Sequence, residues 1–234
     1  MGQFLHQFFS PLDFIRAVPQ VWNGFIFNIK LMLLAEALVL PLALIVAIVR
    51  GLPGRAAAPL RAVAIVYTDF FRGTPLILTL LIVQGFAQLN YVGLSSQTLF
   101  RTGLIALTLT YTAYVTEVYR AGIESVHPSQ RMAARSLGLS YMQALRYVVL
   151  PQAIRRVIPP LLNDFIGLQK DTALVTVIGL TEAVAQSGFY SSDYANDTGF
   201  IVAAVFFIFL TIPLARFTDH IIRERERRER AQMA

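Results

Sequence analysis

Two long apolar runs constrain the fold of this chain more than any other feature. Residues 31–49 (LMLLAEALVLPLALIVAIV) contain a single charge, Glu36, and residues 199–215 (GFIVAAVFFIFLTIPLA) contain none. A helix that crosses the hydrocarbon core of a bilayer needs about 20 mostly apolar residues. The whole chain is 56% hydrophobic and 15% charged, whereas soluble domains carry about 25% charged residues. The sequence therefore predicts an all-α membrane protein.

Five transmembrane helices are predicted, at about 24–49, 61–89, 99–121, 145–169 and 198–218. No internal repeat or linker divides the 234 residues, so a single transmembrane domain is expected, ending in a charged tail at 219–234. The third and fourth spans carry polar residues that lipid would not tolerate, and these should face other protein or a cavity. They are Thr108, Thr110, Thr112, Thr116 and Glu117 in the third span, and Asn163, Asp164 and Gln169 in the fourth.

The basic residues predict the orientation in the membrane. Most of the 20 Lys and Arg residues lie in the loops after the first and third spans, with their flanks, and in the C-terminal tail. Because basic residues concentrate on the cytoplasmic side, the N-terminus is expected outside and the C-terminus inside. The first 20 residues lack the basic start and compact apolar core of a signal peptide, and their aromatic residues predict a short interfacial segment.

The segment RMAARSLGLSYMQALRYVVLP (131–151) is too polar to span a bilayer and too regular for a loop. Ser129 can cap a first helix, and Gly138 stands where a left-handed residue would end it. Ser140 and Gln143 form the pattern of a capping box for a second helix. The sequence thus predicts two short helices joined by a tight glycine turn.

Such a helix pair has two interpretations. A helix-turn-helix can read DNA, but there is no room here for a third supporting helix, and both neighbours enter the membrane. The alternative is a short cytoplasmic helix at 129–139 that docks on a soluble partner. Its apolar patch would be Met132, Ala133 and Leu137, with Arg131 and Arg135 beside it.

The same segment resembles a family motif. Permease subunits of ATP-binding-cassette importers carry E-A-A, three residues, G, nine residues and I-x-L-P before their penultimate span. This chain has Met132-Ala133-Ala134, Gly138, Val148 and Leu150-Pro151 at that spacing. FRGTPL (71–76), EVYRAGIESV (117–126), LPQAIRR (150–156) and KDTAL (170–174) are similar to signatures of the branch that imports polar amino acids, the histidine, glutamine, arginine and glutamate permeases.

This resemblance implies a type I importer permease fold in the bacterial inner membrane, with 129–139 as the coupling helix. It implies a separate cytoplasmic ATPase dimer that binds ATP and Mg²⁺, a second permease copy, an extracytoplasmic substrate-binding protein, a polar amino acid substrate and surrounding lipid. No nucleic acid partner and no cofactor on this chain are expected. Met132 replaces the family's glutamate, which leaves the first cap without an acidic partner. The implied ATPase contacts are Arg131, Met132, Ala133, Ala134, Gly138, Leu139 and Pro151, and the implied docking residues for the binding protein are Lys170 and Asp171.

A charged residue inside the second span marks a candidate substrate site. Arg72 precedes Gly73, Thr74 and Pro75, which should interrupt the helix and free backbone groups for a cavity or ligand. A guanidinium at such a break can hold an α-carboxylate by two parallel hydrogen bonds. The alternative is an ion pair with Asp69, three residues earlier on the same helix.

The fourth span supplies the second candidate. Pro159-Pro160 should bend the helix just before Asn163 and Asp164. The resemblance implies that Asp164 meets a substrate ammonium and Asn163 its polar end, while the alternative is hydrogen bonding between helices. Thr112 is a weaker pathway candidate for the same reason. No role is predicted for Glu36.

Several classes of activity lack their residues. The chain has no Cys, three widely separated His, no G-x-S-x-G and no GxxxxGK[ST] phosphate loop, so neither a metal site, a nucleophilic enzyme nor an ATPase is predicted. A transport subunit remains. The alternatives left open are a permease for another small solute and an ATP-independent channel or secondary transporter.

Overall fold

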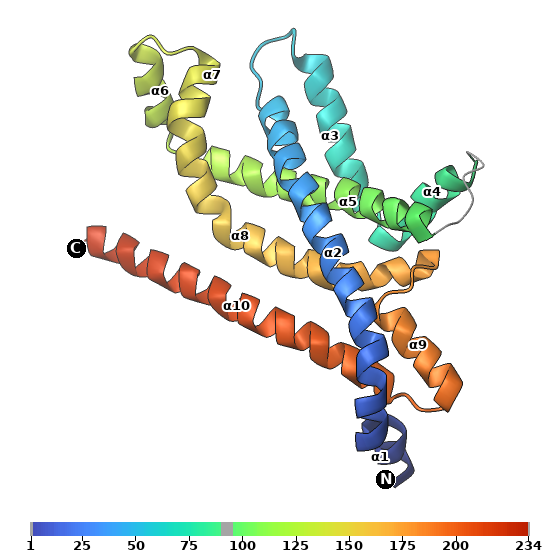
Figure 1. Cartoon of the computed structure of the whole chain (residues 1–234). Coiled ribbons are helices and arrows are strands. Elements are labelled where there is room, and N and C mark those ends of the chain that lie inside the picture. The colour runs from blue at the N-terminus through green and yellow to red at the C-terminus, as the bar shows by residue number, and fades with distance from the viewer. Residues whose placement is uncertain (1, 90–95, 234) are drawn as a thin grey trace.

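The computed structural model describes residues 2–89 and 96–233, and over these residues every regular element is a helix (Figure 1). The elements are α1 (Gly2–Phe9), α2 (Pro11–Arg50), α3 (Ala58–Gly73), α4 (Leu76–Leu89), α5 (Ser96–Ser125), α6 (Pro128–Ser136), α7 (Tyr141–Ala144), the π-helix η1 (Leu145–Val149), α8 (Leu150–Asp171), the 3₁₀-helix η2 (Thr172–Ile178), α9 (Ala183–Tyr194) and α10 (Thr198–Met233).

Helix α2 runs through almost the whole length of the molecule (Figure 1). Ser10 caps it by accepting a hydrogen bond from the Asp13 backbone N–H, and Pro11 fits its first turn, where no donor is needed. Its 40 residues span about 60 Å, roughly twice the hydrocarbon core. The predicted first span, 24–49, is therefore the C-terminal part of a longer helix, and only α1 forms a separate N-terminal segment.

The predicted second span is broken as expected. The helix axis bends by 112° between α3 and α4, and Thr74 between them is extended, with φ −98° and ψ 126°. A residue before proline disfavours the helical conformation, which explains why the break falls at Thr74. The Thr74 hydroxyl donates to the Phe70 carbonyl oxygen at 2.8 Å, so part of the freed backbone is satisfied locally.

Helix α5 packs inside the molecule against α2, α3, α4 and α8. Its threonines lie among protein atoms, which confirms the prediction that the polar face of the third span avoids lipid. One of them, Thr116, donates to the Ala43 carbonyl oxygen of α2 at 3.3 Å. The buried threonines of α5 are Thr102, Thr108, Thr110, Thr112 and Thr116.

By length and composition, α2 and α10 are the two helices among the described residues that can cross a membrane alone. Up to four spans result when each of two bent pairs counts as one, α3 with α4 and the helical stretch 141–178 with α9. The five predicted spans correspond to α2, α3 with α4, α5, α7 to α8, and α10. Helix α5 is too polar in composition to count among these spans, and its polar residues are covered by neighbouring helices.

The chain from α7 to η2 follows a curved helical path (Figure 1). The π-helix η1 joins α7 to α8 without a loop, and Pro159 and Pro160 lie inside α8. The predicted fourth span is thus the central part of one stretch from 141 to 178. Helix α10 likewise joins the predicted last span and the charged tail in one helix.

Helix α9 has no counterpart in the predicted spans. Glu182 caps it by accepting hydrogen bonds from the Val184 and Ala185 backbone N–H groups at 3.0 and 2.9 Å. Asn28 of α2 donates to Glu182 Oε2 at 3.0 Å and accepts from the Ala183 N–H at 3.1 Å. The Asn28 and Glu182 side chains are buried, and their polar atoms are paired, so α9 is fixed to α2.

The short loop between α9 and α10 holds α1. The Asp197 N–H donates to the Gln7 carbonyl oxygen at 2.9 Å, and the Asn196 side chain donates to the His6 carbonyl oxygen at 2.9 Å. These bonds cap the end of α1, whose last carbonyls have no partner within the helix. Hydrogen bonds from the Ser191 and Gln7 side chains lower the pKa of Asp197.

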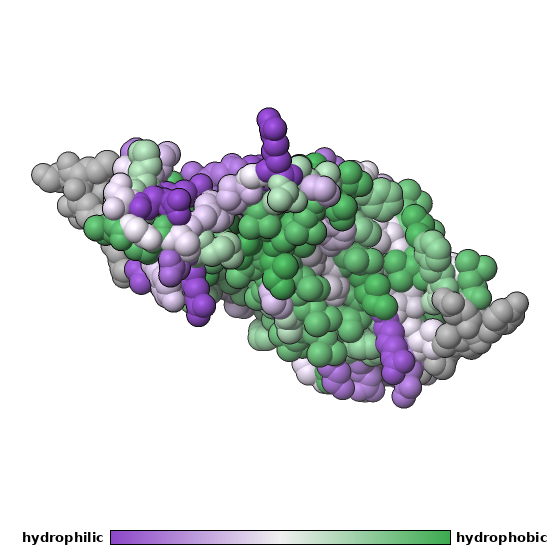
Figure 2. All heavy atoms as spheres, turned by 90° about the horizontal axis from the view of Figure 1, so that it is seen from above, coloured by the Kyte–Doolittle hydropathy of each residue, from purple (hydrophilic) through white to green (hydrophobic). Residues whose placement is uncertain are grey.

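Apolar side chains cover much of the surface. Figure 2 shows them across the middle of one face, with hydrophilic residues toward one end and along the edges. Examples are Leu33 on α2 and Phe209 on α10, which are 54% and 78% exposed. Soluble monomers rarely expose large contiguous apolar patches, so this surface is suited to lipid and to other subunits.

Candidate functional site

The docking helix has the predicted shape, with one different cap. His127, and not Ser129, is the N-cap of α6, and its Nδ1 accepts from the Ser129 N–H at 3.3 Å. The reason is Pro128, which occupies the first helical position and keeps the preceding residue extended. Gly138 has φ +84° as predicted, and the Ser140–Gln143 capping box is present.

The predicted apolar patch on this helix is exposed. Met132 is 63% and Leu137 is 82% exposed, and Ala133, Gly138 and Pro151 are also exposed. Arg131 and Leu139 are half-buried, whereas Ala134 turns inward and is buried. A helix that buries one small residue and exposes two large apolar ones has an open face for a partner.

The first residue of α7, which follows α6, is hydrogen-bonded to the end of α2. The Tyr141 hydroxyl donates to the Gly51 carbonyl oxygen at 2.6 Å. Arg61 of α3 donates to the carbonyl oxygens of Leu52 and Gly54, both at 2.7 Å. These contacts place α6 and α7 at the same end of the molecule as the α2–α3 loop (Figure 1).

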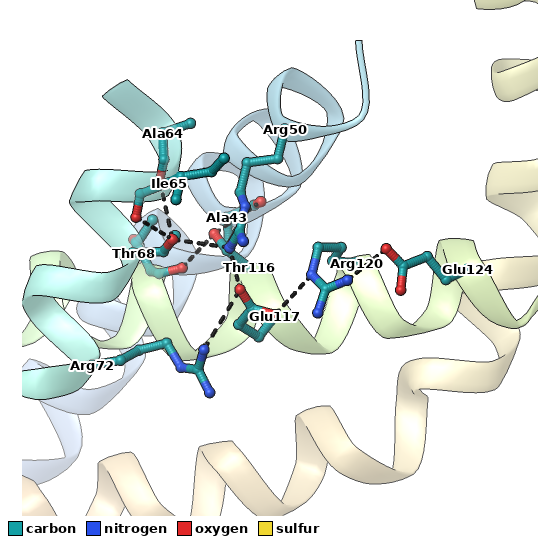
Figure 3. A network of polar contacts seen from close by, with 11 residues as sticks. Ala43, Arg50, Ala64, Ile65, Thr68, Arg72, Thr116, Glu117, Arg120 and Glu124 are labelled. Carbon is teal, nitrogen blue, oxygen red and sulfur yellow. Dashed lines mark hydrogen bonds and ion pairs between the residues drawn. The ribbon is translucent and has the colours of Figure 1, made fainter. Parts of the chain in front are cut away.

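The carboxylate of Glu117 on α5 forms ion pairs with three guanidinium groups (Figure 3). Glu117 Oε1 pairs with Arg50, the last residue of α2, and lies 3.6 Å from Arg72 Nη1. Its other oxygen, Oε2, accepts from Arg120 Nε at 2.8 Å. Arg50 also donates to Thr68 Oγ1 at 2.9 Å. The network therefore joins α2, α3 and α5 beside the break of the second span.

The structure decides how Arg72 is paired. Among the described residues, the ion pair of Arg72 is with Glu117 on α5 and not with Asp69, so the predicted local pair is absent. The guanidinium of Arg72 is 44% exposed at the side-chain level. Arg72 is thus accessible as well as paired.

A cleft of about 640 Å³ lies between α5 and α8, next to this network. Arg156 of α8 crosses part of it, donating to the Ser125 carbonyl oxygen and to Ser125 Oγ, the latter at 3.2 Å. The cleft is lined by Glu117, Val118, Ala121, Gly122, Ser125, Arg156, Val157 and Pro160.

Asp164 lies farther along the face of α8 that lines the cleft. Val157, Pro160 and Asp164 are spaced by three and four residues and so share one helix face. Asp164 Oδ2 is buried without a hydrogen-bond partner among the described residues, and the Asp164 carboxylate is close enough to Glu36 of α2 for the two to interact electrostatically. Asp164 as a whole is half-buried, with Oδ2 enclosed by protein, whereas Asn163 is exposed on the single chain.

The remaining predicted residues lie apart from the cleft lining. Thr112 is buried inside α5, and Thr74 lies in the α3–α4 break. Asp171 accepts a hydrogen bond from the Tyr111 hydroxyl at 2.8 Å, so it is engaged within the chain, while Lys170 is exposed. Arg72 and Asp164 make no direct contact in this structure, but Glu117 and the cleft lie between the elements that carry them.

Two important residues received no site role in the sequence analysis. Glu117 was recognised only as a polar residue that lipid would not tolerate, and Glu36 received no role. The signal for both was a charge within an apolar span. The groups that act on them, Arg50 on Glu117 and the like-charged Asp164 on Glu36, lie on other helices, so neither interaction has a local signature.

Comparisons with known proteins identify the family. The model of the binding-protein-dependent transport system inner membrane component family matches residues 39–227. The probable glutamine ABC transporter permease protein GlnM of Bacillus subtilis (strain 168) is 35% identical over 175 residues, covering 72% of this chain and 77% of that protein. The arginine transport system permease protein ArtQ of the same organism is 33% identical over 210 residues, covering 87% and 92%.

A solved structure agrees with this. The crystal structure of an amino acid ABC transporter with histidines has a TM-score of 0.81 and 32% identity, covering 91% of this chain and 97% of that chain. The likeness covers most of the chain, and the expected permease fold is confirmed. The chain belongs to the family of binding-protein-dependent transport system inner membrane components.

Proposed function

We propose that this chain is the permease subunit of an ATP-driven importer for polar amino acids. The observation that carries the proposal is the capped, exposed helix α6, which offers Met132 and Leu137 and continues through α7 and η1 into α8. A channel or secondary transporter has no need of such a docking helix. The names of the similar proteins, which transport glutamine, arginine or amino acids, support the substrate class.

The coupling mechanism follows from this connection. A dimer of a separate cytoplasmic ATPase binds ATP and Mg²⁺ and closes, and the docked α6 helices of two permease copies move with it. Because α7, η1 and α8 form one unbroken helical path, movement of α6 reaches the cleft on α8. The N-terminus lies outside and the C-terminus inside. An extracytoplasmic binding protein delivers the substrate near Lys170 and Asp171.

The substrate is bound through its charged groups. Arg72 holds the α-carboxylate, with Thr74 beside it, and Asp164 pairs with an ammonium group. Asn163 hydrogen-bonds the polar end of the substrate, and Thr112 supports the pathway from α5. The exposed side of Asn163 is covered by the second permease copy.

Reconstitution tests the proposal. The tagged chain, purified gently from its native membrane, is expected to carry an ATPase, with two permease chains and two ATPase chains in the intact complex by mass spectrometry. In proteoliposomes that also contain the binding protein, uptake of labelled L-arginine, L-glutamine or L-glutamate should require ATP. Uptake that persists without ATP, or a complex that lacks an ATPase, would contradict the importer function.

Asp164→Asn tests the ammonium contact. Uptake of zwitterionic and cationic amino acids is expected to fall by about 10-fold or more, because a hydrogen bond to a charged group contributes about 1.5–3 kcal/mol. Initial rates of ATP-dependent uptake measure this loss. Asp193→Asn, at an exposed position of α9, should leave uptake unchanged. If Asp164→Asn transports every substrate normally, Asp164 is not part of the site.

A further inference from the structure

The three arginines that contact Glu117 differ in their distance from the carboxylate and in their exposure. Arg50 is only 13% exposed at the side-chain level and has a second partner in Thr68. Arg120 donates to Glu117 Oε2 at 2.8 Å from the same helix. Arg72 is the outlier, because its Nη1 lies 3.6 Å from Oε1, beyond hydrogen-bond distance, and 44% of its side chain is exposed.

The Glu117 carboxylate does not depend on Arg72 for its pairing. If Arg72 moves away, Glu117 keeps Arg50 on Oε1 and Arg120 on Oε2. No buried charge is left alone, so the large penalty of an unpaired buried carboxylate does not arise. The Arg72 contact can therefore be broken at small cost, whereas the Arg50 contact cannot.

The position of Arg72 favours an exchange of partners. It lies in the last turn of α3, immediately before the break, and Glu117 lines the cleft. A carboxylate that enters the cleft near Glu117 meets a guanidinium that is already oriented toward a carboxylate (Figure 3). An incoming carboxylate can form the bidentate geometry that Glu117, at 3.6 Å, does not provide.

We propose that Glu117 is an internal competitor for the substrate carboxylate: it holds Arg72 while the cleft is empty and yields it when a carboxylate-bearing solute binds. This inference rests on the proposed function, in which Arg72 binds the carboxylate. The measured affinity is then the difference between two pairings of Arg72. Solutes without a carboxylate cannot displace Glu117 from Arg72. The competition therefore also adds specificity for carboxylate-bearing solutes.

The test separates carboxylate recognition from a structural effect. Binding of L-arginine and L-glutamine, and of their α-carboxamides, which carry no carboxylate, is measured by calorimetry on the purified complex with its ATPase. Glu117→Gln is expected to tighten binding of the acids by about two- to five-fold, the range for a partly exposed ion pair, and to leave the amides unchanged. Glu124→Gln removes another partner of Arg120 that does not contact Arg72, and should change neither.

Two further variants complete the design. In an Arg72→Gln background, Glu117→Gln should no longer affect binding of the acids. If Glu117→Gln does not fold, Glu117→Asp keeps the charge for Arg50 and Arg120 with a shorter reach, and should tighten binding of the acids in the same direction.

Three outcomes overturn the inference: unchanged binding of the acids, weaker binding of the acids, or equal changes for acids and amides. If ATP-driven uptake by the unmodified complex persists alongside any of them, only the competitor role fails. If the unmodified complex neither takes up nor binds these amino acids, the proposed function fails as well, and the competitor role with it.

Discussion

Gly24→Ala is expected to destabilise the protein by about 3 kcal/mol or more, enough to prevent normal accumulation in the membrane. A Cβ at this position would lie 2.6 Å from the Ala183 nitrogen and 2.6 and 2.7 Å from the Glu182 carbonyl carbon and oxygen. All three are backbone atoms, so α2 and α9 must separate. Overpacking alone costs about 1–3 kcal/mol. Separation also weakens the hydrogen bonds of Asn28 to the Glu182 carboxylate and the Ala183 N–H, and a buried polar group left without its partner costs about 1–3 kcal/mol.

The measurement is the amount and melting temperature of detergent-solubilised protein, followed by size-exclusion chromatography. Gly85→Ala is the matched control, because no atom lies within 4 Å of a Cβ at that helical position. It should melt at the same temperature or slightly higher, since alanine favours a helix over glycine by up to about 1 kcal/mol. A Gly24→Ala protein that accumulates and melts like the unmodified chain would show that α9 is not seated on α2 as described.

Unlike Gly24→Ala, Leu137→Asp is expected to leave the fold intact. It should instead abolish most of the ATP-driven uptake. Leu137 is 82% exposed, so its replacement barely changes the packing of the chain. If α6 docks in the ATPase, the change places a charge in an apolar contact. Loss of a central interface residue costs about 2 kcal/mol or more, which corresponds to at least a 30-fold weaker association.

Uptake in proteoliposomes and the amount of ATPase that co-purifies measure this effect together. The control is Leu137→Met, which keeps an apolar side chain of similar size and should support normal uptake. The melting temperature of both variants should match that of the unmodified permease. Normal uptake and normal ATPase recovery with Leu137→Asp would mean that another surface carries the coupling.

The sequence predicted the features that depend on neighbours along the chain. Apolar runs at 31–49 and 199–215 located α2 and α10, and Gly73 and Pro75 located the break between α3 and α4. The glycine turn at Gly138 was also found, because its backbone requirement is local. The cap of α6 was misplaced by two residues, since His127 Nδ1 accepts from the Ser129 N–H and the expected cap, Ser129, lies inside the first turn.

Features that depend on distant residues were missed. For Arg72, helix spacing offered an ion pair with Asp69 as the alternative to carboxylate binding, whereas the ion-pair partner in the structure, Glu117, is on another helix and 45 positions away. Helix α9 was not predicted because the residues that fix it, Asn28 and Glu182, are polar groups that pair only after the chain has folded. Spacing rules describe one helix at a time, so contacts among three helices lie beyond them.

The attachment of α2 to α9 near the middle of α2 gives the following half of this helix the geometry of a lever. Its fixed point is Asn28, which is bonded to Glu182 and Ala183, and Arg50 lies 22 residues away, or about 33 Å along the axis. A tilt of about 10° around that fulcrum would move Arg50 sideways by about 6 Å, more than enough to pull it off Glu117. A small tilt of α2 about Asn28 would therefore also break the ion pair between Arg50 and Glu117.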